Sequence, residues 1–414
     1  MAKFLGYKCS ICQQEYSPDE ITYTCPKDGG NLDVILDIAE IKKVNSNLDF
    51  GKDKEASLWR YLPLLPVYDP GGKDTPIHVA GWTPVYRARS ISEELGLDGL
   101  WIKDESRNPT ASFKDRASAV VIARGREIGA EVVVTASTGN AGAALAGMAA
   151  AIDQKAVIFA PRSAPPAKIA QLLIYGATVY LVDGSYDDAF DLTIQASIEF
   201  GWYCRNTGYN PFTAEGKKTA AFEIWEWMST TKPDIKRPLS VFVSVGDGNI
   251  ISGLHKGFKD LCQLGWMESI PRIYGVQAEG SAAIAKAFQS GSEEIIPVKA
   301  QTIADSISVD LPRDGVRAVR AARETGGGYV VVRDDEIISA MAKLGKIGIF
   351  AEPAGATSFA GLVKAVQNGI IDPNDAVLVI NTGSGLKDVR AAMLAIKEPT
   401  IIEPSLEALK KVIH

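Results

Sequence analysis

The sequence is poor in the residues that build histidine-based or disulfide-based sites. It has three histidines, His78, His255 and His414, which stand far apart along a chain of 414 residues. A multi-histidine metal centre or a Ser-His-Asp triad is therefore not expected. The five cysteines are an odd number in a long chain, which argues against a disulfide framework.

Long apolar runs and a strong charge of either sign are also missing. No apolar run reaches the roughly 20 residues that span a bilayer, and the N-terminus, MAKFLGYKCS, lacks the apolar centre of a signal peptide. The net charge of −6 offers no basic surface to nucleic acid or anionic membranes. Hydrophobic residues make up 46% of the chain and charged residues 23%, a globular balance. We therefore expect a cytoplasmic protein that binds neither nucleic acid nor membrane.

The first 35 residues differ from the rest and carry three of the cysteines. Cys9 and Cys12 form a C-x-x-C turn, and Cys25 opens a second turn in which Asp28 stands where a fourth cysteine is expected. Paired turns of this kind bind zinc tetrahedrally in zinc ribbons, and carboxylate oxygen also binds zinc. We expect a zinc-ribbon-like module with Cys9, Cys12 and Cys25 as metal ligands. The alternative is a degenerate ribbon that is held by packing without metal.

From residue 99 onward, short apolar runs alternate with segments of helical periodicity. The expected strands are Leu100–Ile102, Val132–Thr135, Ala156–Phe159, Val179–Val182, Val241–Val245, Ile273–Val276, Tyr329–Val332 and Val377–Ile380. The expected helices are 115–127, 139–151, 166–175, 186–200, 216–228, 250–263, 334–344 and 355–367. Continuous Val/Ile runs are typical of strands that helices cover on both faces. The pattern predicts an α/β fold with open, largely parallel sheets, in which ligands collect beyond the carboxyl ends of the strands.

These patterns divide the chain into segments. We expect the zinc-ribbon-like module at 1–35 and a Pro-rich extension at 36–98 that wraps the catalytic body. The catalytic body is expected at 99–400, with a smaller subdomain at about 115–225. A C-terminal helix is expected at 401–414.

A lysine follows the first strand of the catalytic body. Residues 106–116 read SRNPTASFKDR, and we expect Ser112 to be the N-cap of a helix with Lys114 in its first turn. The positive end of the helix dipole disfavours the ammonium form, so it favours a neutral, nucleophilic amine at Lys114. A surface lysine on an amphipathic helix is the alternative.

Three further motifs stand at strand–helix junctions. Residues 135–142, TASTGNAG, offer hydroxyl groups and helix N-terminal N–H groups to an anion. Residues 244–250, SVGDGNI, are small enough to form a nest of amides around a phosphate, provided that Asp247 points away or is offset by a cation. Residues 381–388, NTGSGLKD, follow the last strand. For each motif, an ordinary turn is the alternative.

In this order, the four motifs resemble those of fold-type II pyridoxal-phosphate (PLP) enzymes, and most closely those of the threonine synthases, over residues 80–395. The resemblance implies two open parallel-type sheets flanked by helices, and a homodimer. It implies that Lys114 forms the Schiff base with PLP, that Asn140 contacts the cofactor's ring hydroxyl oxygen and that Thr382 meets the pyridine nitrogen. The residues implied to hold the PLP phosphate are Gly246, Asp247, Gly248 and Asn249.

The resemblance also assigns substrate contacts. The loop residues implied to hold the substrate carboxylate are Ser137, Thr138 and Gly139. In the stretch 205–219, Lys217 and Lys218 are expected to serve a substrate phosphate, although a solvated helix start explains them nearly as well. Glu279 and Glu352 are candidates to line the site.

The implied reaction converts O-phosphohomoserine and water to L-threonine and phosphate, the work of a carbon–oxygen lyase that acts on phosphates. The sequence departs from the family pattern at three places, of which the first two leave the substrate open. Ala141 stands where many threonine synthases have threonine, Thr213 and Ala214 occupy a stretch that often carries arginine, and the phosphate turn is one residue shorter. One alternative is therefore β-replacement on O-phosphoserine, as in a cysteate synthase with sulfite. Serine/threonine dehydration, or a catalytically inactive body that carries a metal-ribbon binding module, are weaker alternatives.

Overall fold

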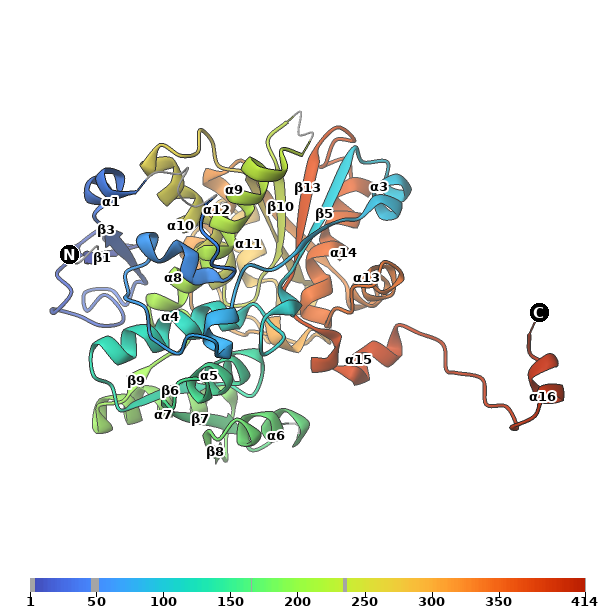
Figure 1. The fold of residues 1–414 in the computed structure, drawn as a ribbon, viewed down its shortest axis with the longest axis horizontal. Coiled ribbons are helices and arrows are strands. Elements are labelled where there is room, and N and C mark those ends of the chain that lie inside the picture. Colours follow the sequence, from blue (N-terminus) through green and yellow to red (C-terminus); the bar gives the residue numbers. More distant parts are fainter. Residues whose placement is uncertain (1–3, 46–51, 165, 234–236, 414) are drawn as a thin grey trace.

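The strands of the chain gather into three sheets, which the computed structural model describes over residues 4–45, 52–164, 166–233 and 237–413 (Figure 1). The six-stranded sheet has the order β12 (Gly328–Val332), β11 (Arg272–Ala278), β10 (Ser240–Ser244), β13 (Ala376–Asn381), β5 (Gly99–Asp104) and β4 (Val85–Arg87). Its strands run parallel except for the edge strand β4. The four-stranded sheet is parallel throughout, in the order β8 (Thr178–Val182), β7 (Lys155–Pro161), β6 (Val132–Ala136) and β9 (Tyr203–Cys204). The predicted α/β fold with open parallel sheets is confirmed.

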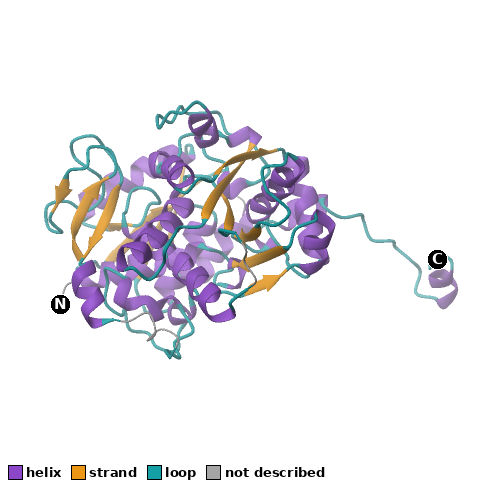
Figure 2. Cartoon of the chain, turned by 90° about the horizontal axis from the view of Figure 1, so that it is seen from above, coloured by secondary structure: helices purple, strands orange, loops and turns teal. Residues whose placement is uncertain are grey.

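Alternate residues of the large sheet enter two different cores. In β10, Val241 and Val243 pack in one core and Phe242 packs in the other. The helices on the first face are α10 (Asn249–Leu264), α11 (Ala283–Gln289) and α12 (Gly315–Glu324), and those on the second are α13 (Asp334–Lys346) and α14 (Pro353–Gln367). Figure 2 shows helices on both faces of the sheet. Burial on both faces explains why the strands read as unbroken apolar runs.

All eight predicted strands are confirmed, and β4 and β9 were missed because they contain only 3 and 2 residues. The predicted helix 216–228 is two helices, α8 (Phe212–Lys217) and α9 (Thr219–Thr231). The other predicted helices correspond to α4 (Lys114–Glu127), α5 (Asn140–Ala150), α6 (Pro166–Ile174), α7 (Tyr186–Phe200), α10, α13 and α14. The helices not predicted are α1 (Ile38–Val44), α3 (Arg89–Leu95), α11, α12 and α15 (Val389–Leu394).

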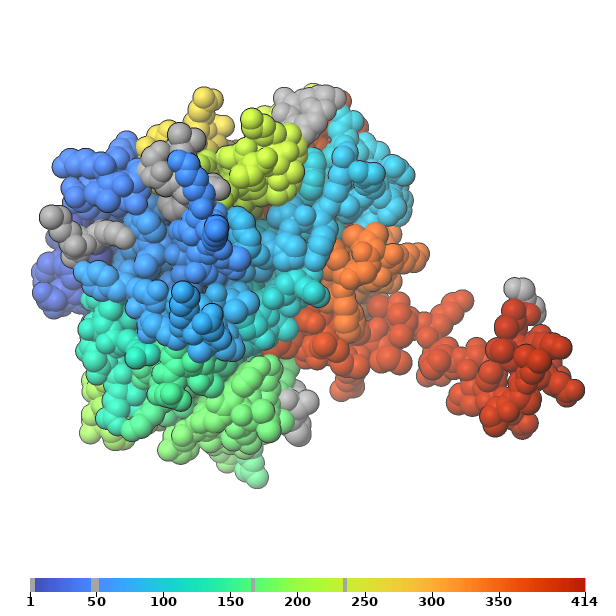
Figure 3. Space-filling model, viewed as in Figure 1, coloured from blue at the N-terminus to red at the C-terminus, as the bar shows by residue number. Residues whose placement is uncertain are grey.

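The two ends of the chain lie outside these layers. At the N-terminus, β2 (Glu15–Tyr16), β1 (Phe4–Cys9) and β3 (Leu32–Leu36) form an antiparallel sheet. After α15 the chain leaves the body and ends with α16 (Leu406–Lys410), which stands clear of the rest (Figure 3). This C-terminal arm exposes the large apolar side chains of Ile396, Ile401, Ile402, Leu406, Leu409, Val412 and Ile413. Among the described residues, no helix is both long enough and apolar enough to cross a bilayer.

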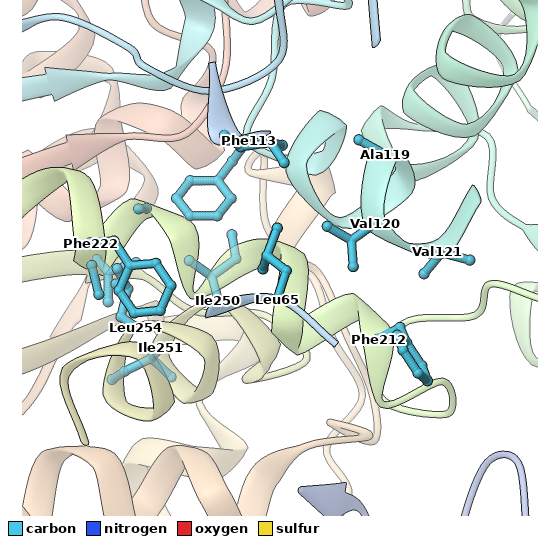
Figure 4. Packing of buried hydrophobic residues seen from close by; sticks show 14 of the residues in the cluster. Leu65, Phe113, Ala119, Val120, Val121, Phe212, Phe222, Ile250, Ile251 and Leu254 are labelled. Atoms are coloured by element: carbon cyan, nitrogen blue, oxygen red, sulfur yellow. The ribbon is translucent and has the colours of Figure 1, made fainter. Parts of the chain in front are cut away.

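Helices α4, α8 and α10 form the packing layer behind the motifs. Phe113 and Phe222 point toward Ile250 and Leu254 in this core, in which all four side chains are buried (Figure 4). At Gly216, a Cβ atom would lie 2.1 Å from the backbone oxygen of Arg116. Only glycine therefore allows α8 to approach α4 so closely, and this approach sets the position of the lysine at the start of α4.

Candidate active site

A cavity of about 380 Å³ lies beyond the carboxyl ends of β6, β10 and β13. The predicted site residues in its lining are Lys114, Ser137, Thr138, Gly139, Asn140, Lys217, Gly246, Asp247, Gly248, Asn249 and Thr382. These residues come from five separate stretches of the sequence. The structure therefore brings the four motifs together at the strand ends, where parallel sheets gather ligands.

Lys114 is the first residue of α4, and tertiary contacts fix the turn before it. The N–H group of Phe113 donates to the carbonyl oxygen of Thr382 at 2.9 Å, and the N–H group of Ser384 donates to that of Ala111 at 3.1 Å. The prediction that Ser112 caps the helix is wrong, because the N-cap is Phe113 and the buried Ser112 hydroxyl has no partner among the described residues. The turn is held by the loop after β13 instead of by a cap.

The amine of Lys114 faces the cavity without a hydrogen bond to any described residue. Burial lowers its pKa, and the guanidinium of Arg205 lowers it further. The carboxylates of Glu352 and Asp247 act in the opposite direction. The net lowering makes the neutral amine, the nucleophilic form of lysine, easier to form than in water.

The turn at 246–249 joins β10 to α10 with its N–H groups unused. Gly248 has a φ of 91°, and a Cβ atom on Gly246 would lie 2.8 Å from the Cα atom of Ile307. Within the described part of the chain, no acceptor meets the N–H groups of residues 246–249. Four free amides at a helix N-terminus are a ready site for an anion.

Asp247 lines the cavity and does not point outward. Its carboxylate accepts the N–H group of Arg313 at 3.4 Å, and its carbonyl oxygen accepts that of Asp314 at 2.9 Å. Burial raises its pKa, whereas the charges of Lys217, Lys114 and Arg313 oppose that shift. The carboxylate beside the turn therefore faces basic side chains, as the sequence required, although burial outweighs their effect on its pKa.

Two adjacent lysines of the substrate stretch have different surroundings. Lys217 is 0% exposed, lines the cavity and donates from Nζ to Oδ1 of Asn249 at 2.5 Å. Its pKa lies well below the usual value, first because of burial and then because of Lys114 and Arg205. Lys218 lies outside the cavity lining and donates to Asp260 at 2.8 Å and to Glu215. We therefore do not retain Lys218 as a substrate-binding residue.

Glu352 is a cavity residue at the start of α14. It is 4% exposed and accepts Nδ2 of Asn140 at 2.6 Å. Burial raises its pKa to about 7, although the hydrogen bond from Asn140 and the charge of Lys114 oppose the shift. Glu279, the other acidic candidate, is exposed and lies outside the lining.

Part of the lining was not among the predicted site residues. Residues 305–309, of which Asp305–Ile307 form a short 3-10 helix, form one wall of the cavity. Tyr186 and Thr207 also line it. Arg205 is fully buried beside this wall, where its side chain donates to Ser118 at 3.2 Å and to Thr207 at 2.7 Å. Residues of this kind are found only once the fold brings loops together.

The predicted metal ligands also lie close together in space. They belong to the first 28 residues, far along the sequence from the cavity motifs. The Sγ atoms of Cys9, Cys12 and Cys25 and a carboxylate oxygen of Asp28 all lie within 4.8 Å of one another. Asp28 thus joins the three cysteines as a fourth candidate ligand.

Comparisons with known proteins agree with this geometry. A family described as "Pyridoxal-phosphate dependent enzyme" matches residues 78–383. Threonine synthase from Methanocaldococcus jannaschii is 41% identical over 409 residues, which is 98% of this chain and 98% of that protein. Threonine synthase from Methanosarcina acetivorans is 38% identical over 410 residues, with the same coverage of both chains.

Solved structures show the same fold at lower identity. The processed form of threonine deaminase isoform 2 from Solanum lycopersicum has a TM-score of 0.64 and 25% identity, covering 77% of this chain and 88% of that chain. Diaminopropionate ammonia lyase from Escherichia coli has a TM-score of 0.65 and 21% identity, covering 77% of this chain and 89% of that chain. The second likeness concerns the fold alone.

Proposed function

The chain belongs to the pyridoxal-phosphate dependent enzyme family, and from this premise we propose that it converts O-phosphohomoserine and water to L-threonine and phosphate. Threonine synthases match it over 98% of its length at 41% and 38% identity. The observation that carries the proposal is one cavity that holds an unpaired amine, a turn of free amides and the amine of a second buried lysine. It is an enzyme with a small amino-acid substrate.

The residues of the cavity fit pyridoxal phosphate. Lys114 would hold the aldehyde carbon covalently, and the free amides of residues 246–249 would hold the phosphate. The hydroxyl of Thr382, which makes no hydrogen bond among the described residues, would meet the pyridine nitrogen. Asn140 would reach the ring oxygen with its amide. When bound, the cofactor withdraws electrons from the α-carbon of the amino-acid substrate.

The chain's own groups then position the substrate and move protons. The hydroxyls of Ser137 and Thr138, together with the N-terminus of α5, bind the α-carboxylate. Lys114, whose lowered pKa makes the neutral amine easier to form, accepts the proton at the α-carbon and returns protons later in the reaction. Thr382 is a neutral hydroxyl, so it does not hold the pyridine nitrogen protonated as a carboxylate would.

Lys217 supplies hydrogen-bond donors for the substrate phosphate. It lies one helical turn after Thr213 in α8, and both side chains donate to Oδ1 of Asn249. Thr213 stands in the stretch where related enzymes often carry arginine, so Lys217 places a basic side chain beside that position. Its amine donates one hydrogen bond to Asn249, and the described residues leave its remaining N–H groups free for phosphate oxygens.

A phosphate-release assay tests the proposed reaction. Purified chain with PLP should release phosphate from O-phosphohomoserine and form L-threonine in equal amounts, whereas Lys114→Ala should release none. The same enzyme should be inactive with O-phosphoserine and sulfite. Turnover of O-phosphoserine with O-phosphohomoserine inert would replace the proposed reaction by β-replacement, the alternative that Ala141 and Thr213 leave open.

We propose three further properties of the protein. It acts in the cytoplasm, a proposal supported by five cysteines that are all free thiols. It works as a homodimer, a proposal supported by the exposed apolar side chains of the arm after residue 395, which the other described residues do not cover. Its segments are the module 1–35, the extension 36–98, the catalytic body 99–400 with a subdomain at about 115–225, and the end helix within 401–414.

A further inference from the structure

Four candidate ligand atoms near the N-terminus lie within 4.8 Å of one another. The Sγ atoms of Cys12 and Cys25 are 3.7 Å apart, and Sγ of Cys9 is 3.3 Å from Oδ1 of Asp28. Zinc bonds of about 2.3 Å to sulfur and about 2.0 Å to oxygen place two sulfurs about 3.8 Å apart and a sulfur and an oxygen about 3.5 Å apart. The observed separations match both edges to within a few tenths of an ångström.

The two turns that present these atoms share one backbone conformation. The N–H group of Gln13 donates to Cys9 oxygen at 3.1 Å, and that of Gly29 donates to Cys25 oxygen at 2.8 Å. Both donors follow the second ligand of their turn and have positive φ, 62° for Gln13 and 70° for Gly29. Asp28 therefore holds the same position in the second turn as Cys12 holds in the first. That position is the one from which a metal ligand points.

The surroundings of the sulfurs favour a metal over a disulfide. Cys12 and Cys25 are separated by 3.7 Å, whereas a disulfide bond is about 2.05 Å long. The N–H group of Ile11 donates to Sγ of Cys9 at 3.3 Å, a contact that stabilises a thiolate. A Cβ atom on Gly30 would lie 2.7 Å from the same sulfur, so glycine keeps the space beside the ligands open.

This module contacts the substrate stretch directly. Just before β3, Nδ2 of Asn31 donates to the carbonyl oxygen of Gly208 at 2.5 Å. The Tyr23 ring stacks on Tyr209 with 4.5 Å between ring centroids, and the Tyr23 hydroxyl accepts the N–H group of Cys204 at 2.9 Å. The stretch 204–209 ends one turn before α8, the helix that carries Lys217.

The module also contacts the residues that hold the phosphate turn. Asn31 donates to the carbonyl oxygen of Arg313 at 2.9 Å, and Asp33 pairs with Arg317 at 2.7 Å. Arg317 pairs with Asp314 at 2.7 Å, and Asp314 accepts Nδ2 of Asn249 at 2.7 Å. The backbone of Asp314 in turn donates to Asp247 at 2.9 Å. Two or three contacts therefore separate the metal module from the turn 246–249.

We propose that Cys9, Cys12, Cys25 and Asp28 bind one zinc ion, and that the zinc-loaded module holds the turn 246–249 and the stretch 204–209 in place for the cofactor. The zinc site stands independently of the proposed reaction. The coupling rests on the assignment of the cavity to PLP, which the family match supports. It does not depend on which phosphorylated substrate is used.

Metal content and cofactor affinity test the two parts of this proposal. Purified full-length chain, incubated with zinc and desalted, should retain one zinc per chain by elemental analysis. Cys12→Ser should lose it and Asp28→Cys should retain it, with Cys262→Ser as a cysteine control away from the module. Chelator-stripped wild type should bind PLP about tenfold more weakly in an absorbance titration, and added zinc should restore the affinity.

The outcomes separate the two parts. If neither wild type nor Asp28→Cys retains zinc, the proposed metal site is wrong. Retained zinc with equal PLP affinity in loaded and stripped protein would overturn the coupling. Stripped wild type and Asp28→Cys provide these answers even where Cys12→Ser does not fold, and neither result depends on phosphate release from O-phosphohomoserine.

Discussion

The carboxyl group of Glu352 makes a pH-dependent contribution to stability that substitution should remove. In the cofactor-free protein its pKa is raised from 4.5 to about 7, mainly by burial. Because the folded value is above the unfolded value, the unfolded chain loses this proton first as pH rises. Stability is therefore lost between about pH 4.5 and pH 7 and stays reduced above that range.

The size of the effect follows from the two pKa values. A difference of about 2.5 units corresponds to roughly 3 kcal/mol at full effect. At pH 5 only about 1 kcal/mol of this penalty is present, and at pH 8 about 3 kcal/mol. Glu352→Gln cannot ionise, and its side-chain oxygen can still accept Nδ2 of Asn140.

Urea unfolding of the cofactor-free proteins measures this difference. The free energy of unfolding of Glu352→Gln should exceed that of wild type by about 2 kcal/mol more at pH 8 than at pH 5. Comparing the same pair of proteins at both pH values cancels other titrating groups and any constant effect of the substitution. An advantage of the variant that is equal at both pH values would refute the reasoning.

Three further substitutions test the framework and the site. Arg116→Met leaves the buried carboxylates of Glu105 and Glu223, now 2.7 Å and 2.5 Å from the guanidinium, without that partner, and should cost roughly 3–5 kcal/mol in urea unfolding; a loss below 1 kcal/mol would contradict this. Gly216→Ala should lower the free energy of unfolding by about 1–3 kcal/mol, because α4 and α8 must separate, and unchanged stability would refute the contact. Lys217→Gln should raise KM for O-phosphohomoserine at least about tenfold with cofactor absorbance unchanged, and an unchanged KM would remove Lys217 from the substrate site.

The sequence predicted those parts of the fold that depend on local pattern. The strands were visible because burial on both faces makes them continuously apolar, and their order placed the motifs at the strand ends. The N-cap at Ser112 was wrong because a tertiary contact, the bond from Phe113 to Thr382, holds the turn in place of a local one. The edge strands β4 and β9 are too short to show a pattern.

The sequence could not distinguish between residues of the same type when choosing site residues. Lys217 and Lys218 differ by about 100° around α8, so one enters the cavity and the other meets Asp260. Both side chains are fully buried. A polar, exposed helix face that would show which of the two lysines points into the cavity is therefore missing from the sequence pattern. Glu352 and Glu279 were likewise equal candidates until the fold placed only Glu352 beside Lys114.

Covalent trapping of the cofactor tests the central claim most directly. The chain is incubated with PLP, reduced with borohydride and digested, and the labelled peptide is identified by mass spectrometry. The account predicts one label, on Lys114, with Lys217 unmodified although its amine borders the same cavity. A label on Lys217 or on a surface lysine, with Lys114 unlabelled, would contradict it.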